Sequence, residues 1–132
     1  MKKTGVVIFI QREDNAILLV KQNKEPYKGY WAPPHGTIED GETIQQAVIR
    51  EAMEEIGLSV VPIKELWVSD ADYKVSTLYW WLAKPFFAKD ISIDTREISE
   101  YGYFFLKDLF ALQIMPSAKT FLFRLQAGEI LL

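Results

Sequence analysis

The 132-residue chain contains no cysteine and a single histidine, His35. The absence of cysteine excludes disulfides, a cysteine nucleophile, and thiolate sites for zinc or iron–sulfur clusters. One histidine cannot build a His-rich metal site either. A metal in this protein must therefore be held by oxygen atoms, which favours magnesium, manganese or calcium.

A block of basic residues and a long apolar run are also missing. The formal net charge is −3, and binding to a nucleic-acid polymer is not expected, because contact with its phosphates requires clustered Lys and Arg. No apolar run is long enough to cross a bilayer. The N-terminal segment lacks the small-residue cleavage pattern of a signal peptide and indicates a first strand instead. A cytoplasmic protein with no membrane partner is the resulting expectation.

The composition indicates one globular domain over residues 1–132, because hydrophobic residues make up 49% of the chain. Apolar and β-branched runs predict strands over 4–10, 16–21, 59–70, 73–85 and 100–106, the first two joined as a hairpin. Helices are predicted over 44–56, within 106–112 and over 117–130, while segment 86–94 gives no clear element. Strands on both sides of one helix, with another helix at the end, indicate a mixed α/β domain.

The segment GETIQQAVIREAMEEIGL, residues 41–58, predicts a capped amphipathic helix. Thr43 and Gln46 fit a capping box at its start, and Gly57 is the expected stop. At roughly 100° per residue, one apolar stripe is formed by Ile44, Val48, Ala52 and Ile56 and widened by Ile49 and Met53. This stripe is expected to pack on a sheet.

The last turns of this helix carry Glu51, Glu54 and Glu55 beside Arg50. The three carboxylates form a compact patch at the edge of the apolar stripe, where like charges repel each other. A divalent cation would convert this repulsion into binding, because carboxylate oxygens suit hard cations. A solvated acidic face is the alternative interpretation of the helix taken alone.

Extended back to residue 36, the segment GTIEDGETIQQAVIREAMEEIGL resembles the Nudix box. The matching positions are Gly36, Glu42, Arg50, Glu51, Glu54, Glu55 and Gly57. Ala52 is a departure, because the family often has a larger aliphatic residue there. The order of predicted elements is also similar to the Nudix fold. The resemblance implies an α/β/α sandwich with a mixed β-sheet, the box loop–helix between strands, and a C-terminal helix.

Nudix enzymes hydrolyse a nucleoside diphosphate linked to another group, and Mg²⁺ or Mn²⁺ neutralises the phosphate oxygens. The resemblance implies that Glu51, Glu54 and Glu55 bind the metal, with the backbone carbonyl of Gly36 as a further ligand. Glu51 is also the candidate to deprotonate or orient the attacking water. Arg50 would orient the glutamates through ion pairs.

Further carboxylates take supporting or catalytic roles by the same resemblance. Glu42 matches another box position and would hold Arg50 or a metal-bound water, and Glu39 is assigned a supporting role beside it. Many family members supply one more catalytic carboxylate from a later loop. Glu97 is the first candidate for it and Glu100 the second, with a solvated loop residue as the alternative for either.

The segment WAPPHG, residues 31–36, is similar to the start of the box in the diadenosine tetraphosphate hydrolases of the family. Tyr73 falls where such hydrolases carry a tyrosine, while His35 stands in place of their usual lysine. The candidate substrate-binding residues are Trp31, His35, Tyr73, Lys74 and Tyr101, with Trp67 as a further candidate for base stacking and Lys28 for phosphate contact. Core packing is the alternative for the aromatic residues.

The resemblance implies a pyrophosphohydrolase acting on a small nucleotide such as diadenosine tetraphosphate. The alternatives within the family are cleavage of nucleoside triphosphates, including oxidised ones, and cleavage of ADP-ribose. A nucleotide-binding sensor of the same fold is the alternative that is not an enzyme, and the three retained glutamates favour catalysis over it. The sequence leaves open whether the protein is a monomer or a homodimer.

Overall fold

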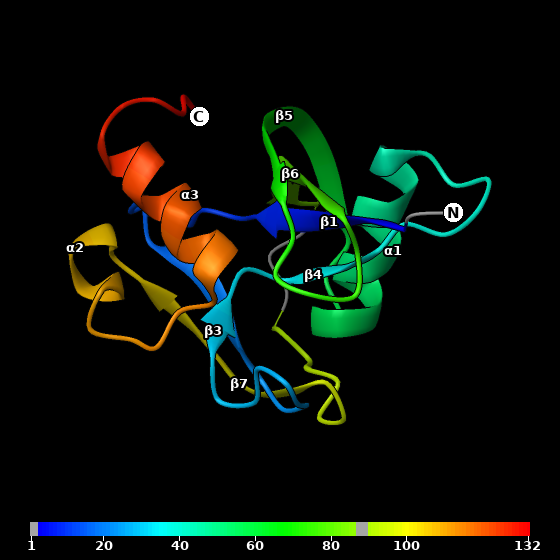
Figure 1. Cartoon of the computed structure of the whole chain (residues 1–132), viewed down its shortest axis with the longest axis horizontal. Helices are drawn as coiled ribbons and strands as arrows, with labels where there is room; N and C mark the ends of the chain where they lie inside the picture. The colour runs from blue at the N-terminus through cyan, green and yellow to red at the C-terminus, as the bar shows by residue number, and fades with distance from the viewer. Residues whose placement is uncertain (1–2, 87–89) are drawn as a thin grey trace.

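The computed structural model describes residues 3–86 and 90–132, so residues 87–89 of the unassigned segment 86–94 lie outside the described residues. Figure 1 shows β1 between helices α1 and α3. The elements are β1 (Thr4–Phe9), β2 (Ile17–Gln22), β3 (Trp31–Ala32), β4 (His35–Thr37), α1 (Ile44–Ile56), β5 (Val60–Asp70), β6 (Thr77–Pro85), β7 (Ile98–Phe104), α2 (Leu106–Leu109) and α3 (Pro116–Gln126).

The strands form two sheets. One is four-stranded with the order β4-β1-β6-β5, and the other is three-stranded with the order β3-β2-β7. In the first sheet β1 runs parallel to β6, whereas β4 and β5 are antiparallel to their neighbours. The predicted mixed sheet is therefore confirmed.

The predicted hairpin of the first two strands is wrong beyond its turn. The turn is present, since Arg12 N–H donates to the Ala16 carbonyl at 2.8 Å and Gln11 bridges Ile17. Past this point β1 pairs with β4 and β6, while β2 pairs with β3 and β7. Each strand thus has a neighbour on both edges, and no edge is left on which the two could form a long ladder with each other.

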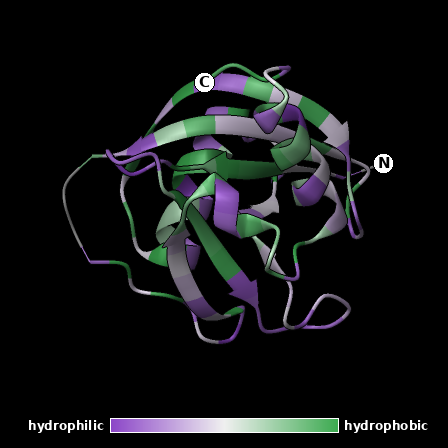
Figure 2. Cartoon of the chain, turned by 90° about the vertical axis from the view of Figure 1, so that its left-hand side faces the viewer, coloured by the Kyte–Doolittle hydropathy of each residue, from purple (hydrophilic) through white to green (hydrophobic). Residues whose placement is uncertain are grey.

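Strand β1 separates two hydrophobic cores, because successive side chains point to opposite faces of a strand. Val7 and Phe9 pack toward α3, whereas Val6, Ile8 and Ile10 pack toward α1. Figure 2 shows hydrophobic residues, in green, concentrated on the strands in the middle of the molecule, whereas the outer strands alternate between green and purple. Burial on both faces explains why β1 is apolar at successive positions and does not alternate with polar residues. The helices on the two sides confirm the expected α/β/α sandwich.

Helix α1 has the predicted bounds and caps. Thr43 Oγ1 accepts from Gln46 N–H at 3.1 Å, Gln46 Oε1 accepts from Thr43 N–H at 2.8 Å, and Gly57 adopts φ 67°. The helix is thereby fixed at both ends, which sets the direction in which its polar residues project.

The predicted apolar stripe of α1 is wrong on one flank. Ile49 and Met53 are 45% and 46% exposed, whereas the fully buried residues are Ala47, Val48, Ala52 and Ile56. The sheet contact is made partly by small alanine side chains, which let the helix lie close to the strands. The two larger side chains are left on the flank that faces away from the sheet.

The remaining boundaries differ from the predictions at turns. Strand β6 begins at Thr77 and not at residue 73, because Lys74 adopts φ 68° in the preceding turn and cannot continue a strand. Strand β7 spans residues 98–104, two residues earlier than expected, and the short helix α2 covers only residues 106–109. Helix α3 ends at Gln126, before Gly128 at φ 77°.

No helix in the described part of the chain is both long and apolar enough to cross a membrane.

Replacing Gly57 by alanine tests the helix stop. We expect Gly57→Ala to lower the free energy of unfolding by about 1–2 kcal/mol, since an L side chain is strained in the left-handed region. The added Cβ would also lie 3.1 Å from the Ser92 Cβ. Gly128→Ala is the control, because it has the same backbone conformation but nothing within 4 Å of its Cβ. Urea denaturation should show the larger loss for Gly57→Ala, and a larger loss at Gly128 would contradict this account.

Candidate active site

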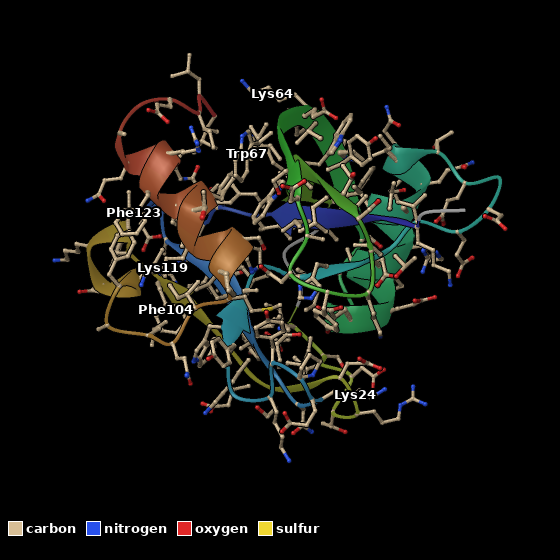
Figure 3. The ribbon with its side chains drawn as sticks, in the orientation of Figure 1. Lys24, Lys64, Trp67, Phe104, Lys119 and Phe123 are labelled. Carbon is tan, nitrogen blue, oxygen red and sulfur yellow. The ribbon has the colours of Figure 1, made fainter. Side chains whose placement is uncertain are left out.

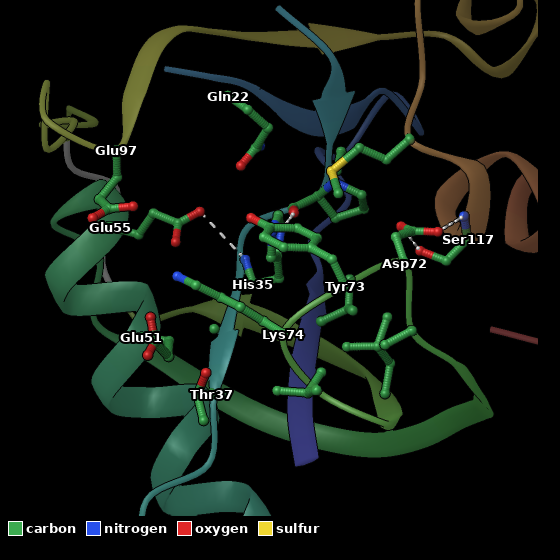
Figure 4. A pocket seen from close by; sticks show the side chains of 18 of the residues that line it. Gln22, His35, Thr37, Glu51, Glu55, Asp72, Tyr73, Lys74, Glu97 and Ser117 are labelled. Carbon is green, nitrogen blue, oxygen red and sulfur yellow. Dashed lines mark hydrogen bonds between the residues drawn. The ribbon is translucent and has the colours of Figure 1, made fainter. Parts of the chain in front are cut away.

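A cleft with a volume of about 590 Å³ runs across the molecule from α1 to the start of α3. One wall comes from α1 and β4, and the other comes from the turn between β5 and β6. Residues of β2 and of the segment before β7 close one side. Figure 4 shows Glu51, Glu55 and Glu97 near one end and Asp72 and Ser117 near the other.

Arg50 is the centre of the polar network at the α1 end. Its Nε and Nη2 donate to the two carboxylate oxygens of Glu42 at 2.7 and 2.9 Å. Its Nη1 donates to Glu51 at 2.8 Å and to Glu54 at 3.1 Å, and Nη2 also reaches the Thr37 carbonyl at 2.8 Å. The hydrogen bond with Glu42 is the main cause of the raised pKa of this guanidinium. Arg50 therefore joins α1 to the box loop.

Glu42 and Glu39 lie in this loop. The pKa of Glu42 is lowered, mainly by its hydrogen bond with Arg50. Glu42 also accepts from the Glu39 backbone N–H at 3.0 Å, which fixes the loop backbone. The Glu39 carboxylate lies 3.7 Å from Arg50 Nη1, and its side chain is 67% exposed. Glu42 is thus a structural partner of Arg50, and Glu39 stands at the solvent side of the same network.

Glu51 and Glu55 are two partly buried carboxylates one turn apart on α1. Burial raises the pKa of Glu51, although the bond to Arg50 opposes this effect. Burial and then the charge of Glu51 raise the pKa of Glu55 well above its usual range. Glu55 accepts a hydrogen bond of 3.3 Å from the His35 backbone N–H, and within residues 3–86 and 90–132 it forms no ion pair with Lys or Arg.

Gly36 on β4 faces these carboxylates directly. A Cβ atom at this position would overlap the carboxyl group of Glu51, so any other residue would force this glutamate to move away from the strand. The donor set around this point consists of carboxylate and carbonyl oxygens with an excess of negative charge. Such a set fits a hard divalent cation.

The described residues contain no cluster of three acidic or histidine side chains already arranged around one point. Glu51 and Glu54 are turned toward Arg50, and Glu55 is turned toward the backbone of His35. Their positions on α1 are nevertheless neighbouring, since residues three and four apart share one helix face. A cation bound by all three would therefore require these side chains to rotate away from their present partners.

The two candidates for an additional carboxylate have different surroundings. Glu97 lines the cleft, lies beside Glu55 in Figure 4, and pairs with Lys24 at 2.7 Å. Lys24 is the labelled side chain near the loop beside β7 in Figure 3. Glu100 pairs with Lys21 at 3.2 Å and does not line the cleft. The geometry therefore favours Glu97.

Three of the predicted substrate-binding residues line the cleft. The His35 ring donates from Nδ1 to the Pro33 carbonyl at 2.9 Å, and burial lowers its pKa. Tyr73 and Lys74 come from the turn between β5 and β6, and Figure 4 shows both side chains reaching across the cleft. Burial raises the pKa of Tyr73, so its phenol stays protonated at neutral pH.

The other candidates do not line the cleft. Trp31 packs edge-on against Phe104 with ring centroids 5.1 Å apart, and Tyr101 lies on β7 with 44% of its surface exposed. Trp67 packs against Trp80 and Phe121 and contributes to the core beneath α3. Lys28 lies in the loop before β3, also outside the cleft.

Several polar residues of the cleft were not found by the sequence reasoning. They include Gln22, Asp72, Asp94 and Ser117. The Asp72 carboxylate accepts from Ser117 N–H at 2.9 Å and from Ser117 Oγ at 2.6 Å, which ties the β5–β6 turn to the first turn of α3. These hydrogen bonds join residues 45 positions apart, so no local sequence pattern predicts them.

The comparisons with known proteins identify the family of the chain. A family model, the NUDIX domain, matches residues 1–125, and the chain therefore belongs to the NUDIX family. The membership expected from the sequence is confirmed. An uncharacterised Nudix hydrolase of Bacillus subtilis, YvcI, is 31% identical over 114 residues, which are 83% of this chain and 68% of that protein.

An ADP-ribose pyrophosphatase of Methanocaldococcus jannaschii is 51% identical over 49 residues, which are 37% of this chain and 29% of that protein. The chain thus spans well under half the length of this relative. Among solved structures, a MutT NUDIX hydrolase of Burkholderia pseudomallei is 26% identical with a TM-score of 0.78 and coverage of 92% and 96% of the two chains. An Ap4A hydrolase of C. elegans is 25% identical with a TM-score of 0.70 and 96% coverage of both.

Removing the Arg50 guanidinium tests whether it holds the box together. We expect Arg50→Met to lower the free energy of unfolding by about 2 kcal/mol, because Glu42 and Glu51 are then left with neither their cation nor full access to water. Their side chains are only 12% and 13% exposed. Arg124→Met is the control, since Arg124 pairs with Glu129 at the surface. Equal losses in the two variants, measured by urea denaturation, would contradict a special role of Arg50.

Proposed function

We propose that this protein is a Nudix pyrophosphohydrolase that uses Mg²⁺ or Mn²⁺ to cleave a nucleoside diphosphate linked to another group. The observation that supports this proposal most strongly is that two partly buried carboxylates, Glu51 and Glu55, line one cleft together with the Arg50 network. Glu51, Glu54, Glu55 and the Gly36 carbonyl are the proposed metal ligands. When bound, the metal supplies neutralisation of phosphate oxygens and activation of water.

The residues of the chain contribute orientation and proton transfer. Arg50 holds Glu51 through its Oε1, so the other oxygen, Oε2, is directed to take a proton from the attacking water. Glu97 lies close enough to raise the pKa of Glu55, and it adds a further carboxylate to the same end of the cleft. Lys74 faces this negative end and is the proposed phosphate contact.

The proposed substrate is a small nucleotide. The cleft volume of about 590 Å³ is within the range of small-ligand sites and has no room for a folded polymer. Its far end is lined by apolar side chains, including Leu78, Trp80 and Met115, which suit a nucleoside more than a phosphate. Tyr73 stands between the two ends and is the proposed stacking partner of the base.

Two substrates within this class are supported by different relatives. The likeness to the Ap4A hydrolase extends over nearly the whole of both chains and supports a dinucleoside polyphosphate such as diadenosine tetraphosphate. The higher identity with the ADP-ribose pyrophosphatase supports ADP-ribose, although over a shorter segment. Both substrates contain a nucleoside joined through phosphates to another group, so both fit the same division of the cleft.

A substrate panel tests the proposal. We expect diadenosine tetraphosphate or ADP-ribose to be hydrolysed at least roughly tenfold faster, in kcat/KM, than ATP and an oxidised nucleoside triphosphate, because only the former carry a sugar or a second nucleoside on the far side of the phosphates. Products should be followed by ion-exchange chromatography with Mg²⁺, with Mn²⁺, and with EDTA. Unchanged rates in EDTA would overturn the metal mechanism. Nucleotide binding without hydrolysis would instead indicate a sensor.

Neutralising one box glutamate tests the catalytic assignment. We expect Glu55→Gln to lower kcat on the order of 100-fold, with the melting temperature unchanged or raised. The raised pKa shows that the ionised carboxylate is disfavoured in the folded protein, so its removal does not weaken the fold.

Glu97→Gln should also lower the rate, and Glu100→Gln is the matched control, since Glu100 lies on β7 outside the cleft. A loss of activity in Glu100→Gln as large as that in Glu97→Gln would refute the choice between the two.

A further inference from the structure

Gln22 is the one buried polar side chain in the part of the chain that the structure describes, with 9% of its surface exposed. It is the last residue of β2, where the ladder with β7 shifts register between Lys21 and Gln22. The side chain lines the cleft. A buried amide requires a partner for each of its polar atoms, or it destabilises the fold.

The hydrogen bonds of Gln22 leave one of these atoms without a partner. Its backbone N–H donates to the Tyr30 carbonyl at 2.8 Å, and its backbone carbonyl accepts from Gly29 N–H at 2.8 Å. Its side-chain Nε2 donates to the Val20 carbonyl at 3.3 Å. Because the Val20 carbonyl can only accept, the amide atom that faces it is the donating nitrogen and the other end is the oxygen. Within residues 3–86 and 90–132, Oε1 accepts no hydrogen bond.

The free oxygen is directed into the cleft. Figure 4 shows the Gln22 side chain descending from β2 with its oxygen toward the space bordered by Glu55 and Tyr73. The orientation is set by the Nε2 bond to Val20, since a planar amide held at its nitrogen presents its oxygen on the other side. Gln22 therefore offers a fixed hydrogen-bond acceptor to whatever occupies the cleft.

The Gln22 Oε1 acceptor favours a ligand group that can donate a hydrogen bond. The oxygens of an ionised diphosphate carry no proton, and the carboxylates of Glu51, Glu55 and Glu97 already supply the charge at that end of the cleft. The donors of a nucleotide are its ribose hydroxyls and the exocyclic amino group of its base. Because the amide is neutral, its preference between ligands depends on this hydrogen bond and not on charge.

We infer that Gln22 is a specificity-determining residue whose Oε1 accepts a hydrogen bond from the nucleoside part of the substrate, either from a ribose hydroxyl or from the base amino group. The inference rests on the proposed function and specifies which part of the substrate the enzyme recognises, namely the nucleoside. A ligand that lacks this donor displaces water from the oxygen on the cleft wall without replacing its hydrogen bond, and is disfavoured for that reason.

The experiment compares substrates as well as enzymes. The wild-type chain and Gln22→Met, which has a similar length but no amide, are assayed with Mg²⁺ on ADP-ribose, 2′-deoxy-ADP-ribose and the hypoxanthine analogue of ADP-ribose. The same comparison is made with ATP, 2′-deoxy-ATP and ITP. We expect the wild type to lose roughly tenfold in kcat/KM on one analogue. A loss on the deoxy compounds identifies the hydroxyl as the donor, and a loss on the hypoxanthine compounds identifies the amino group.

Gln22→Met should lose a similar factor on the parent compound and lose no more on the analogue. Loss of the bond to Val20 lowers its melting temperature in any case, and the ratio of kcat/KM between two substrates does not depend on how much enzyme is folded. Gln126→Met, at an exposed position on α3 outside the cleft, is the control and should keep the wild-type ratios.

The possible failures are distinguishable. If the wild type hydrolyses both analogues as well as the parent compound, or if Gln22→Met keeps the wild-type ratio, Gln22 is structural only and the proposed function stands. If the wild type hydrolyses neither series and no diadenosine tetraphosphate, the proposed function fails and the role of Gln22 fails with it.

Discussion

The contacts of the Arg50 guanidinium are the interaction on which the rest of the site depends. One side chain binds two carboxylates that are largely removed from water, a third at the surface, and the carbonyl of Thr37 on β4. The helix and the box loop are thereby held at one distance. Because its five N–H groups are spread over several acceptors, the guanidinium orients the acidic end of the cleft, and among the described residues Glu55 remains outside its ion pairs.

The α/β/α sandwich supplies a rigid base for this arrangement. Strand β1 is buried on both faces and joins β4 to β6, so the strand that carries Gly36 and the strand that follows the Tyr73 turn are fixed relative to each other. The box helix is held against the same sheet by small buried residues. The acidic wall and the aromatic wall of the cleft are therefore positioned by one continuous core.

Local patterns predicted what is locally determined. The bounds and caps of α1 follow from Thr43, Gln46 and Gly57, and each acts within a few residues of itself. The hairpin was mispredicted because strand pairing depends on which neighbours are available across the whole sheet. The exposure of Ile49 and Met53 depends on how closely the helix approaches the strands. Gln22 and Asp72 line the cleft because segments that are distant in the sequence meet there. The spacing of residues along the chain does not predict such contacts.

The hydrogen bonds between Asp72 and Ser117 connect the cleft to the C-terminal helix. Helix α3 has no capping side chain of its own at Met115, and the carboxylate that satisfies its first turn comes from the turn carrying Tyr73. The outer rim of the cleft is thus anchored by the last helix, far along the chain from the box. A substitution at Ser117 therefore acts first on the cleft wall that carries Tyr73, and not on the wall of α1 that carries the glutamates.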